Sequence, residues 1–392
     1  MFGYNSDSFN QLGNGYKPIG EIMKSKLSTF CVLVLSTVLI LPGMYSASAV
    51  PASKAVAGTQ CDRVNSVAKG KGVNGSDLTC LVIKSGTFKG ISYWTYKNMK
   101  PLDSIEFVSS SRIGGGYGLT AVAAGEALKQ EGLLNSYTVS YYANAALGLG
   151  YFKSQKDRKN IMLVTGFAMP AGLINNKSTD SMLDTQPLIG FLREANAIVV
   201  PTNSKYKNIK DLLADIKKSP KTVALGGGNI GGADHITLAE LVKTINIAAT
   251  DLNYVSYSGG GAIIPDIVSG RLAAAVSGTS EFDKYVEAGQ LRVLAVTSPL
   301  PLTTIKGQTL IQQGIKMTFG NWRGLLAPKD LPAADYLNML QVLDFAHNTV
   351  AWQAMLVDNS WLDEYRAGKV FSSWITKEVD AIIANLKAFK LA

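Results

Sequence analysis

The sequence predicts an α/β protein in which two doubly wound lobes enclose a ligand cleft. From Ser104 onward, apolar strand-like segments alternate with helix-like segments, the pattern of strand–helix–strand units around a parallel sheet. Several of these strands run directly into glycines before the next helix begins. The chain has 392 residues, 47% of them hydrophobic and 17% charged, so it can bury two cores and does not have a disordered composition.

Residues 1–49 are predicted to be an export signal. Met23–Lys26 is a basic segment, Leu27–Leu41 is apolar, and Ala47–Ala49 fits a cleavage site of small residues. Met23 is therefore a candidate for the true start codon. The alternative, a retained membrane anchor, is disfavoured because the apolar stretch is interrupted by polar residues and is shorter than the ~20 residues of a membrane-spanning helix. We expect the exported protein to be soluble in the periplasm or outside the cell after cleavage near Ala49.

The cysteines agree with export. Cys31 lies in the signal, which leaves Cys61 and Cys80 as an even pair in an oxidising compartment, where we expect them to form a disulfide. They lie in residues 50–101, which are rich in Gly, Lys and Ser. These residues are expected to form a small disulfide-closed β-hairpin module or an extended linker. No lipidation pattern precedes Cys61.

The charge of the chain is positive. Without residues 1–49 it has 35 basic and 27 acidic residues, a formal charge of +8. Such an excess could steer an anion, a nucleic acid or a membrane surface. The basic residues are scattered without interleaved aromatic residues, which disfavours nucleic acid.

The order of the elements divides the rest of the chain into two lobes. Lobe 1 is expected to comprise residues 102–199 and 321–392, and lobe 2 residues 200–320, with hinge crossings at Val199–Pro201 and Phe319–Gly320. Apolar runs and helical spacing predict strands at 104–110, 137–142, 160–167 and 197–200, and helices at 119–131, 209–217, 333–350, 351–356 and 371–386.

Residues 221–298 have the most informative pattern. In KTVALGGGNIGGADHITLAELVKTI a strand ends in a glycine loop that opens a helix, and LNYVSYSGGGAIIPDIVSG repeats this unit. LAAAVSG, a short helix ending near Gly289 and the strand LRVLAVTS follow. Helix N-termini present free N–H groups and partial positive charge, so this edge of the sheet suits an anionic ligand. The segment contains no recognisable catalytic group.

The sequence gives little support for a nucleotide-cofactor site, a metal site or a hydrolase active site. Gly226-x-Gly228-x-x-Gly231 matches a dinucleotide fingerprint in form, but Asp251 precedes the next strand instead of closing it. An exported protein also has no supply of nicotinamide cofactor. The two histidines, His235 and His347, have no metal-ligand spacing, and a structural or second-shell role is expected for His235. The motif Gly-x-Ser-x-Gly is absent. We therefore expect no catalytic residues, no cofactor and no metal.

Four segments in order resemble the solute receptors of tripartite tricarboxylate transporters, the Bug-type extracytoplasmic binding proteins. They are IEFVSSSRIGGGYG, VALGGGNIGGADHI, YVSYSGGGAIIPDIVSGRLAAAVSG, and AGQLRVLAVTS followed by NWRGLLAPKDLP. The resemblance covers about residues 100–390. It implies a type II periplasmic-binding-protein fold and carboxylated solutes held largely by backbone N–H groups and water. The ligand-binding residues expected from these loops are Ser110, Arg112, Gly114, Gly115, Gly116, Tyr117, Ala145, Ala146, Gly228, Asn229, Gly231, Gly232, Asp234, Tyr257, Gly259, Gly260, Ser277 and Thr279.

The sequence departs from the family pattern at the loops. The family's usual Asp after the first Gly-Gly-Gly is Gly118, and serines of the second loop are replaced by glycines at 227, 228 and 232. Arg112 enters the first loop, and Arg323 replaces an aromatic residue beside Trp322. Loss of a carboxylate that could meet an amino group, with a gain of guanidinium donors, favours a plain di- or tricarboxylate, with Arg112 the stronger candidate for ligand contact.

The resulting hypothesis is a non-enzymatic receptor, expected to be monomeric, that captures a small organic anion for a membrane permease. A ligand-binding sensor subunit of a membrane signalling system stays open as an alternative, because the sequence does not separate transport from sensing. An enzyme on the same α/β frame is the third hypothesis.

Overall fold

The computed structural model describes residues 49–84 and 89–390, which belong to one compact unit, Ser48–Ala392. The predicted export signal, its cleavage site up to Ser48 and Cys31 lie outside the described residues. Among the residues that are described, no helix is both long and apolar enough to cross a membrane.

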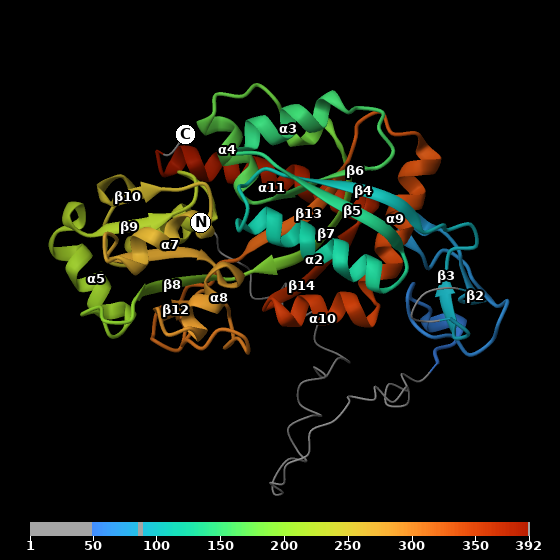
Figure 1. The fold of residues 1–392 in the computed structure, drawn as a ribbon, viewed down its shortest axis with the longest axis horizontal. Helices are drawn as coiled ribbons and strands as arrows, with labels where there is room; N and C mark the ends of the chain where they lie inside the picture. Colours follow the sequence, from blue (N-terminus) through green and yellow to red (C-terminus); the bar gives the residue numbers. More distant parts are fainter. Residues whose placement is uncertain (1–48, 85–88, 391–392) are drawn as a thin grey trace, which may run out of the picture. The chain divides into compact units, whose positions relative to one another are not determined.

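A six-stranded sheet forms the larger half of the fold (Figure 1). Its strand order is β14-β7-β13-β6-β4-β5. β4 is parallel to β5 and β6, whereas β13 and β14 run antiparallel to their neighbours. The strands are β4 (Leu102–Ser109), β5 (Leu134–Tyr141), β6 (Ile161–Gly166), β7 (Gln186–Glu194), β13 (Asn321–Ala327) and β14 (Trp361–Ala367).

Helices cover this sheet and close its core. Phe191 of β7 and Trp352 are fully buried, with ring centroids 5.1 Å apart. The helices are α2 (Gly116–Gln130), α3 (Ala145–Ser154), α4 (Ala168–Asn175), α9 (Ala333–His347), α10 (Val350–Asp358) and α11 (Gly368–Ala388). Short 3₁₀ turns lie at η2 (Ala52–Lys54), η3 (Val73–Gly75), η4 (Met182–Asp184), η5 (Pro220–Thr222) and η6 (Ala249–Asp251).

A five-stranded sheet in the order β10-β9-β11-β8-β12 forms the second half. Apolar clusters bury both of its faces, one around Ile198 and Leu238 and the other around Val199 and Ile263. Its elements are β8 (Asn196–Pro201), α5 (Ile209–Lys218), β9 (Ala224–Gly227), α6 (Ala233–Lys243), β10 (Asn253–Ser256), α7 (Gly260–Val268), β11 (Ala274–Gly278), α8 (Thr279–Glu287) and β12 (Leu291–Val296).

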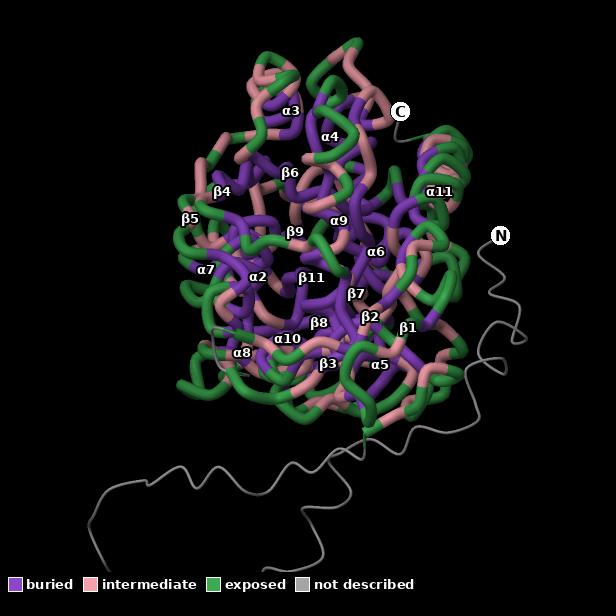
Figure 2. Tube along the Cα trace, turned by 90° about the vertical axis from the view of Figure 1, so that its right-hand side faces the viewer, coloured by how far each residue is buried: buried purple, intermediate pink, exposed green. Residues whose placement is uncertain are grey.

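The mixed α/β architecture confirms the predicted fold class, but the sheets are not purely parallel. β8 pairs antiparallel with both β11 and β12, because it enters the second sheet from the first without a crossover helix. A single residue, Ala195, separates β7 from β8. Residues 196–199, expected in lobe 1, therefore belong to the five-stranded sheet. Sequence analysis placed the crossing at Val199–Pro201, whereas the polar residues Arg193, Glu194 and Asn196 mark it within the apolar run of residues 188–201. Figure 2 shows β7, β8 and β11 as buried tubes.

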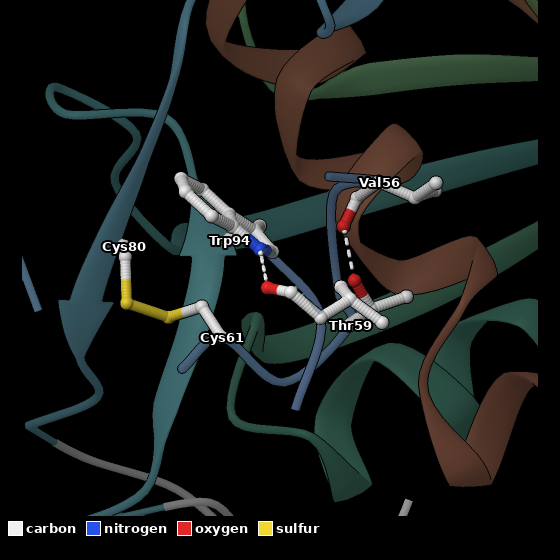
Figure 3. Close-up of a disulfide and its surroundings, with 6 residues drawn as sticks. Val56, Thr59, Cys61, Cys80 and Trp94 are labelled. Atoms are coloured by element: carbon white, nitrogen blue, oxygen red, sulfur yellow. Dashed lines mark hydrogen bonds between the residues drawn. A yellow bond between two sulfur atoms is a disulfide. The ribbon is translucent and has the colours of Figure 1, made fainter. Parts of the chain in front are cut away.

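The first described residues form a separate three-stranded module, not an extended linker. Its antiparallel strands are β1 (Val67–Ala68), β2 (Leu78–Val82) and β3 (Ser92–Thr95). The predicted Cys61–Cys80 disulfide is present, with the Cα atoms 5.8 Å apart (Figure 3). Beside it, the fully buried Trp94 donates its indole N–H to the carbonyl oxygen of Val50 at 2.9 Å.

This N-terminal module packs on the C-terminal part of the chain. The amide of Asn348 donates to the carbonyl oxygen of Ala57 at 2.9 Å, and the Lys369 N–H donates to the Asn74 side chain at 2.9 Å. The hydroxyl of Tyr96 donates to the carboxylate of Asp344. The module is therefore fastened to α9, to the residue after it and to the start of α11.

Candidate functional site

The loop between β9 and α6 contains three glycines and turns the chain sharply. Gly231 has φ of +72°, a conformation in which residues other than glycine are strained, and its N–H donates to His235 Nδ1 at 3.1 Å. Burial lowers the pKa of His235 to about 4, so the imidazole is neutral and can accept this bond. His235 thus holds the loop, as its expected structural role requires. No group of His, Cys, Asp and Glu in the described part of the chain could hold a metal ion.

Glycine loops from the two sheets meet main chain to main chain. A methyl group added at Gly261 would lie 3.1 Å from the carbonyl oxygen of Gly114, and one at Gly259 would lie 3.3 Å from the Cα of Gly115. A methyl group added at Gly231 would collide with the Leu386 side chain of α11. The absence of side chains therefore allows the starts of α2 and α7 to touch, in a closed arrangement.

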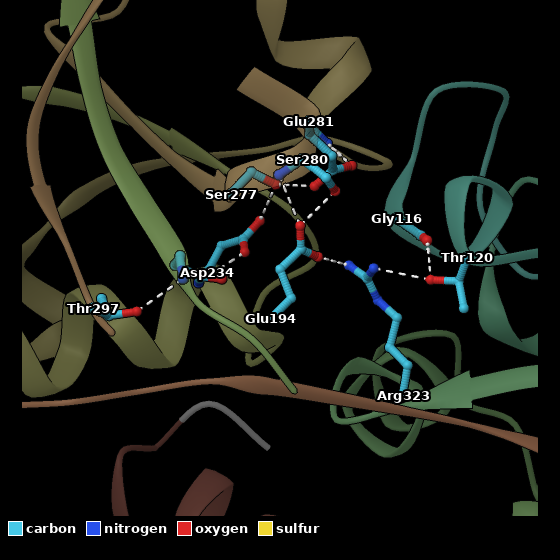
Figure 4. A network of polar contacts seen from close by, with 11 residues as sticks. Gly116, Thr120, Glu194, Asp234, Ser277, Ser280, Glu281, Thr297 and Arg323 are labelled. Carbon is cyan, nitrogen blue, oxygen red and sulfur yellow. Dashed lines mark hydrogen bonds and ion pairs between the residues drawn. The ribbon is translucent and has the colours of Figure 1, made fainter. Parts of the chain in front are cut away.

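A buried ion pair lies between the sheets, near these loops (Figure 4). Arg323 of β13 is 2% exposed and donates to the carboxylate of Glu194, which is completely buried at the end of β7. Its other terminal nitrogen donates to the Thr120 hydroxyl at 3.0 Å. The guanidinium also lies over the ring of Trp361, with its Cζ 5.7 Å from the ring centroid. Gly116 leaves room for it, because a side chain there would collide with the guanidinium.

Two further buried carboxyl groups continue this network into the five-stranded sheet. Glu281 accepts a hydrogen bond from the Gly260 N–H at 3.0 Å, and Asp234 accepts one from the Gly228 N–H at 2.8 Å. Ser277 lies between them and donates to either carboxylate. Glu194 joins the same network by accepting from the N–H of Ser280 at 2.9 Å.

The protein's own carboxylates thus occupy positions that suit an external anion. The Glu281 carboxylate accepts from the N–H of Gly260, the first residue of α7, and the Glu194 carboxylate accepts from the N–H of Ser280, the second residue of α8. Backbone N–H groups at these positions lack partners within the helix. Of the three carboxyl groups, only Glu194 contacts the buried arginine. Burial and the neighbouring Glu281 together raise the pKa of Asp234 to about 7. Burial and Glu194 likewise raise the pKa of Glu281. Both groups therefore take up protons at a higher pH than ordinary carboxyl groups do.

Several buried polar atoms around the network form no hydrogen bond within the described residues. They include the hydroxyls of Ser110 and Thr279 and the side-chain oxygen of Asn196. The Ser110 hydroxyl lies against Gly148, in the first part of α3. Buried polar groups normally have partners, so these atoms are free to bind a polar ligand or water.

The structure brings many of the predicted residues together. Gly228, Asp234, Gly260 and Ser277 are joined by the hydrogen bonds above, and the predicted glycines 114, 115 and 259 lie at the contact between the sheets. Gly116 lies against Arg323, Gly231 and Gly232 turn the second loop, and Thr279 begins α8.

The other predicted residues lie less close to the network. Arg112 is exposed, so its role in ligand binding stays a prediction. Tyr117 is buried in α2, and Tyr257 donates to Asp266 on the surface of α7. Ala145 and Ala146 begin α3, and Asn229 forms the turn before Gly232.

Sequence analysis missed Glu194, Asn196 and Glu281 and ranked Arg323 below Arg112. A signal was available for the first two, because Arg193–Asn196 is a polar interruption in an otherwise apolar run that is long enough for two strands. Glu281 carries no such signal, since an acidic residue in the first turn of a helix is ordinary.

Comparisons with known proteins identify relatives. Residues 161–379 match a family model described as the tripartite tricarboxylate transporter family receptor. The curated protein BugT of Bordetella pertussis is 29% identical over 136 residues, which are 34% of this chain and 41% of BugT. The chain matches less than two thirds of the length of each curated relative found.

Solved structures share the fold. The periplasmic binding protein BugD is 18% identical, with a TM-score of 0.65 over 74% of this chain and 99% of BugD. MatC from Rhodopseudomonas palustris, solved with bound malate, is 14% identical, with a TM-score of 0.62 over 72% of this chain and 98% of MatC.

Proposed function

Because the chain belongs to the family of tripartite tricarboxylate transporter receptors, we propose that it captures a small carboxylated solute outside the cytoplasm and delivers it to a membrane permease. The solute favoured is a di- or tricarboxylate. The malate bound to MatC supports a carboxylate in a protein of the same fold.

The observation that carries this proposal is the meeting of glycine loops at helix starts. α2, α6 and α7 all begin in glycines, and two of these starts touch across the sheets. N–H groups at such starts bind carboxylate oxygens and favour negative charge. A solute that separates Gly114 from Gly261 would contact both sheets at once.

In the proposed cycle the two lobes move about their crossings and close on the solute. Lobe 1 comprises the six-stranded sheet and its helices, and lobe 2 the five-stranded sheet. The crossings lie at Ala195 and within residues 297–320, where the Phe319 N–H donates to the carbonyl oxygen of Thr297 at 3.0 Å. In the closed form without solute, the carboxylates of Glu194 and Glu281 accept hydrogen bonds from N–H groups at helix starts. On binding, the solute's carboxylates would replace these two side chains.

A thermal-shift screen of residues 50–392 tests the proposal. Dicarboxylates and tricarboxylates are expected to raise the melting temperature, because a ligand that binds only the folded state stabilises it by mass action. Amino acids, aromatic acids and neutral sugars form the comparison set. Hits are then measured by calorimetry.

Gly228→Val should abolish binding, since its side chain would keep a ligand away from the loop and meet Asp234. Gly150→Val, in α3, is the matched glycine control and should bind normally, because an added Cβ atom there meets no other atom within 4 Å. Tighter binding of neutral sugars than of any acid, or unchanged binding by Gly228→Val, would overturn this account of the site.

A further inference from the structure

The N-terminal module carries most of the positive charge of the described chain. Residues 50–101 contain eight Lys and Arg and two Asp, a formal charge of +6, compared with +8 for residues 50–392. All eight basic residues are exposed, and none of them forms an ion pair within the described part of the chain. Their charge is therefore available to an external partner.

Basic and aliphatic side chains gather at one end of the module's sheet. The N–H of Asn65 donates to the carbonyl oxygen of Cys80 at 2.8 Å, and the N–H of Ile83 donates to that of Ile91 at 2.9 Å. These bonds place the segments 63–65, 80–84 and 89–91 side by side. We call the exposed basic and aliphatic residues of these segments the hairpin-end surface: Arg63, Val64, Val82, Lys84, Lys89 and Ile91.

The aliphatic members of this surface are exposed. Val64, Val82 and Ile91 are 45%, 44% and 41% exposed. Asp62 adjoins them and leaves the local charge positive. A soluble polyanion could pair with these cations, but it has no apolar phase to receive the aliphatic side chains. A membrane surface can bind both kinds of group.

We propose that the hairpin-end surface docks the protein on a bilayer containing anionic phospholipids. Arg63, Lys84 and Lys89 contact lipid phosphates, and the aliphatic side chains enter the boundary between head groups and acyl chains. The module is fastened to α9 and α11 and none of its contacts described above involves the glycine loops. Docking therefore leaves the solute site accessible and does not depend on the proposed function.

The experiment measures co-sedimentation of residues 50–392 with vesicles of phosphatidylcholine, with and without phosphatidylglycerol. Binding is expected only to the anionic vesicles and should weaken as salt rises, because ions screen the surface potential. The triple variant Arg63→Glu, Lys84→Glu, Lys89→Glu should lose at least about tenfold in vesicle affinity. Val64→Ser with Ile91→Ser should weaken binding while keeping its salt dependence.

The matched control is Lys210→Glu, Lys306→Glu, Lys316→Glu, which makes the same charge change at exposed positions of the other half of the fold. It should keep most of the affinity, and circular dichroism should show all variants folded. An equal loss in this control, no binding of the wild type to anionic vesicles, or displacement of the protein by soluble polyphosphate without an effect of the aliphatic changes would overturn the proposal.

Discussion

At the scale of single residues, the two arginines considered from the sequence differ in their surroundings. Arg323 is buried against Glu194 and Thr120, whereas Arg112 is exposed. Arg323→Met should cost about 3–5 kcal/mol of unfolding free energy, because it leaves the Glu194 charge buried without its partner. Urea unfolding measures this. Arg112→Ala is the control and should change stability by less than about 0.5 kcal/mol. A stable Arg323→Met protein would contradict the importance of the pair.

Glu281 allows a second test at this scale, because it occupies the N–H group at the start of α7. Glu281→Gln should raise the affinity for a carboxylate solute roughly tenfold, since it removes a negative charge from the place where the solute binds. Calorimetry with a hit from the screen measures this. Glu287→Gln, an exposed change in α8, the helix that also contains Glu281, should leave the affinity unaltered. Weaker binding by Glu281→Gln would instead mean that the carboxylate itself contacts the solute.

At the scale of elements, the network that joins α6, α7 and α8 should make stability depend on pH. The pKa of Asp234 rises from its ordinary 3.8 to about 7 in the folded protein. Between these values the folded state holds a proton that the unfolded chain has released, so this group's contribution to stability falls as pH rises from about 4 to about 7. Asp234→Asn should therefore lose less stability between pH 5 and pH 8 than the wild type, in urea titrations at each pH. The exposed Asp380→Asn should behave like the wild type.

The elements also show what could be predicted from the sequence. Strands ending in glycines were predictable, because apolar runs followed by glycine and a helix have few other readings, and β9 with α6 follows that prediction. β14 was not predicted, since Leu362–Arg366 contains three charged residues among five and lacks the regular apolar alternation of a strand. The carboxyl network was missed for a similar reason: Glu194 and Glu281 lie 87 positions apart, and their meeting depends on how the two sheets pack.

At the scale of the whole molecule, the disulfide and the site should be separable. Thiol titration of denatured, unreduced residues 50–392 should find no free cysteine. Reduction should lower the unfolding free energy by about 3 kcal/mol in the chain-entropy model. Solute affinity should stay nearly unchanged, because the disulfide lies in the N-terminal module. The Cys61→Ser, Cys80→Ser variant should match the reduced protein, and a loss of solute binding in that variant would tie the module to the site.

The fastening of the N-terminal module to α9 and α11 has a consequence for the order of folding. Ala57 is hydrogen-bonded to a residue 291 positions later in the chain, Asn348. Asn74 is hydrogen-bonded to a residue 295 positions later, Lys369. Contacts of such sequence separation form late, since the loop between them must close first. During synthesis the N-terminal module can therefore form these contacts only after α9 and the start of α11 have been made. A nascent chain that cannot finish folding early is suited to being threaded through a secretion channel.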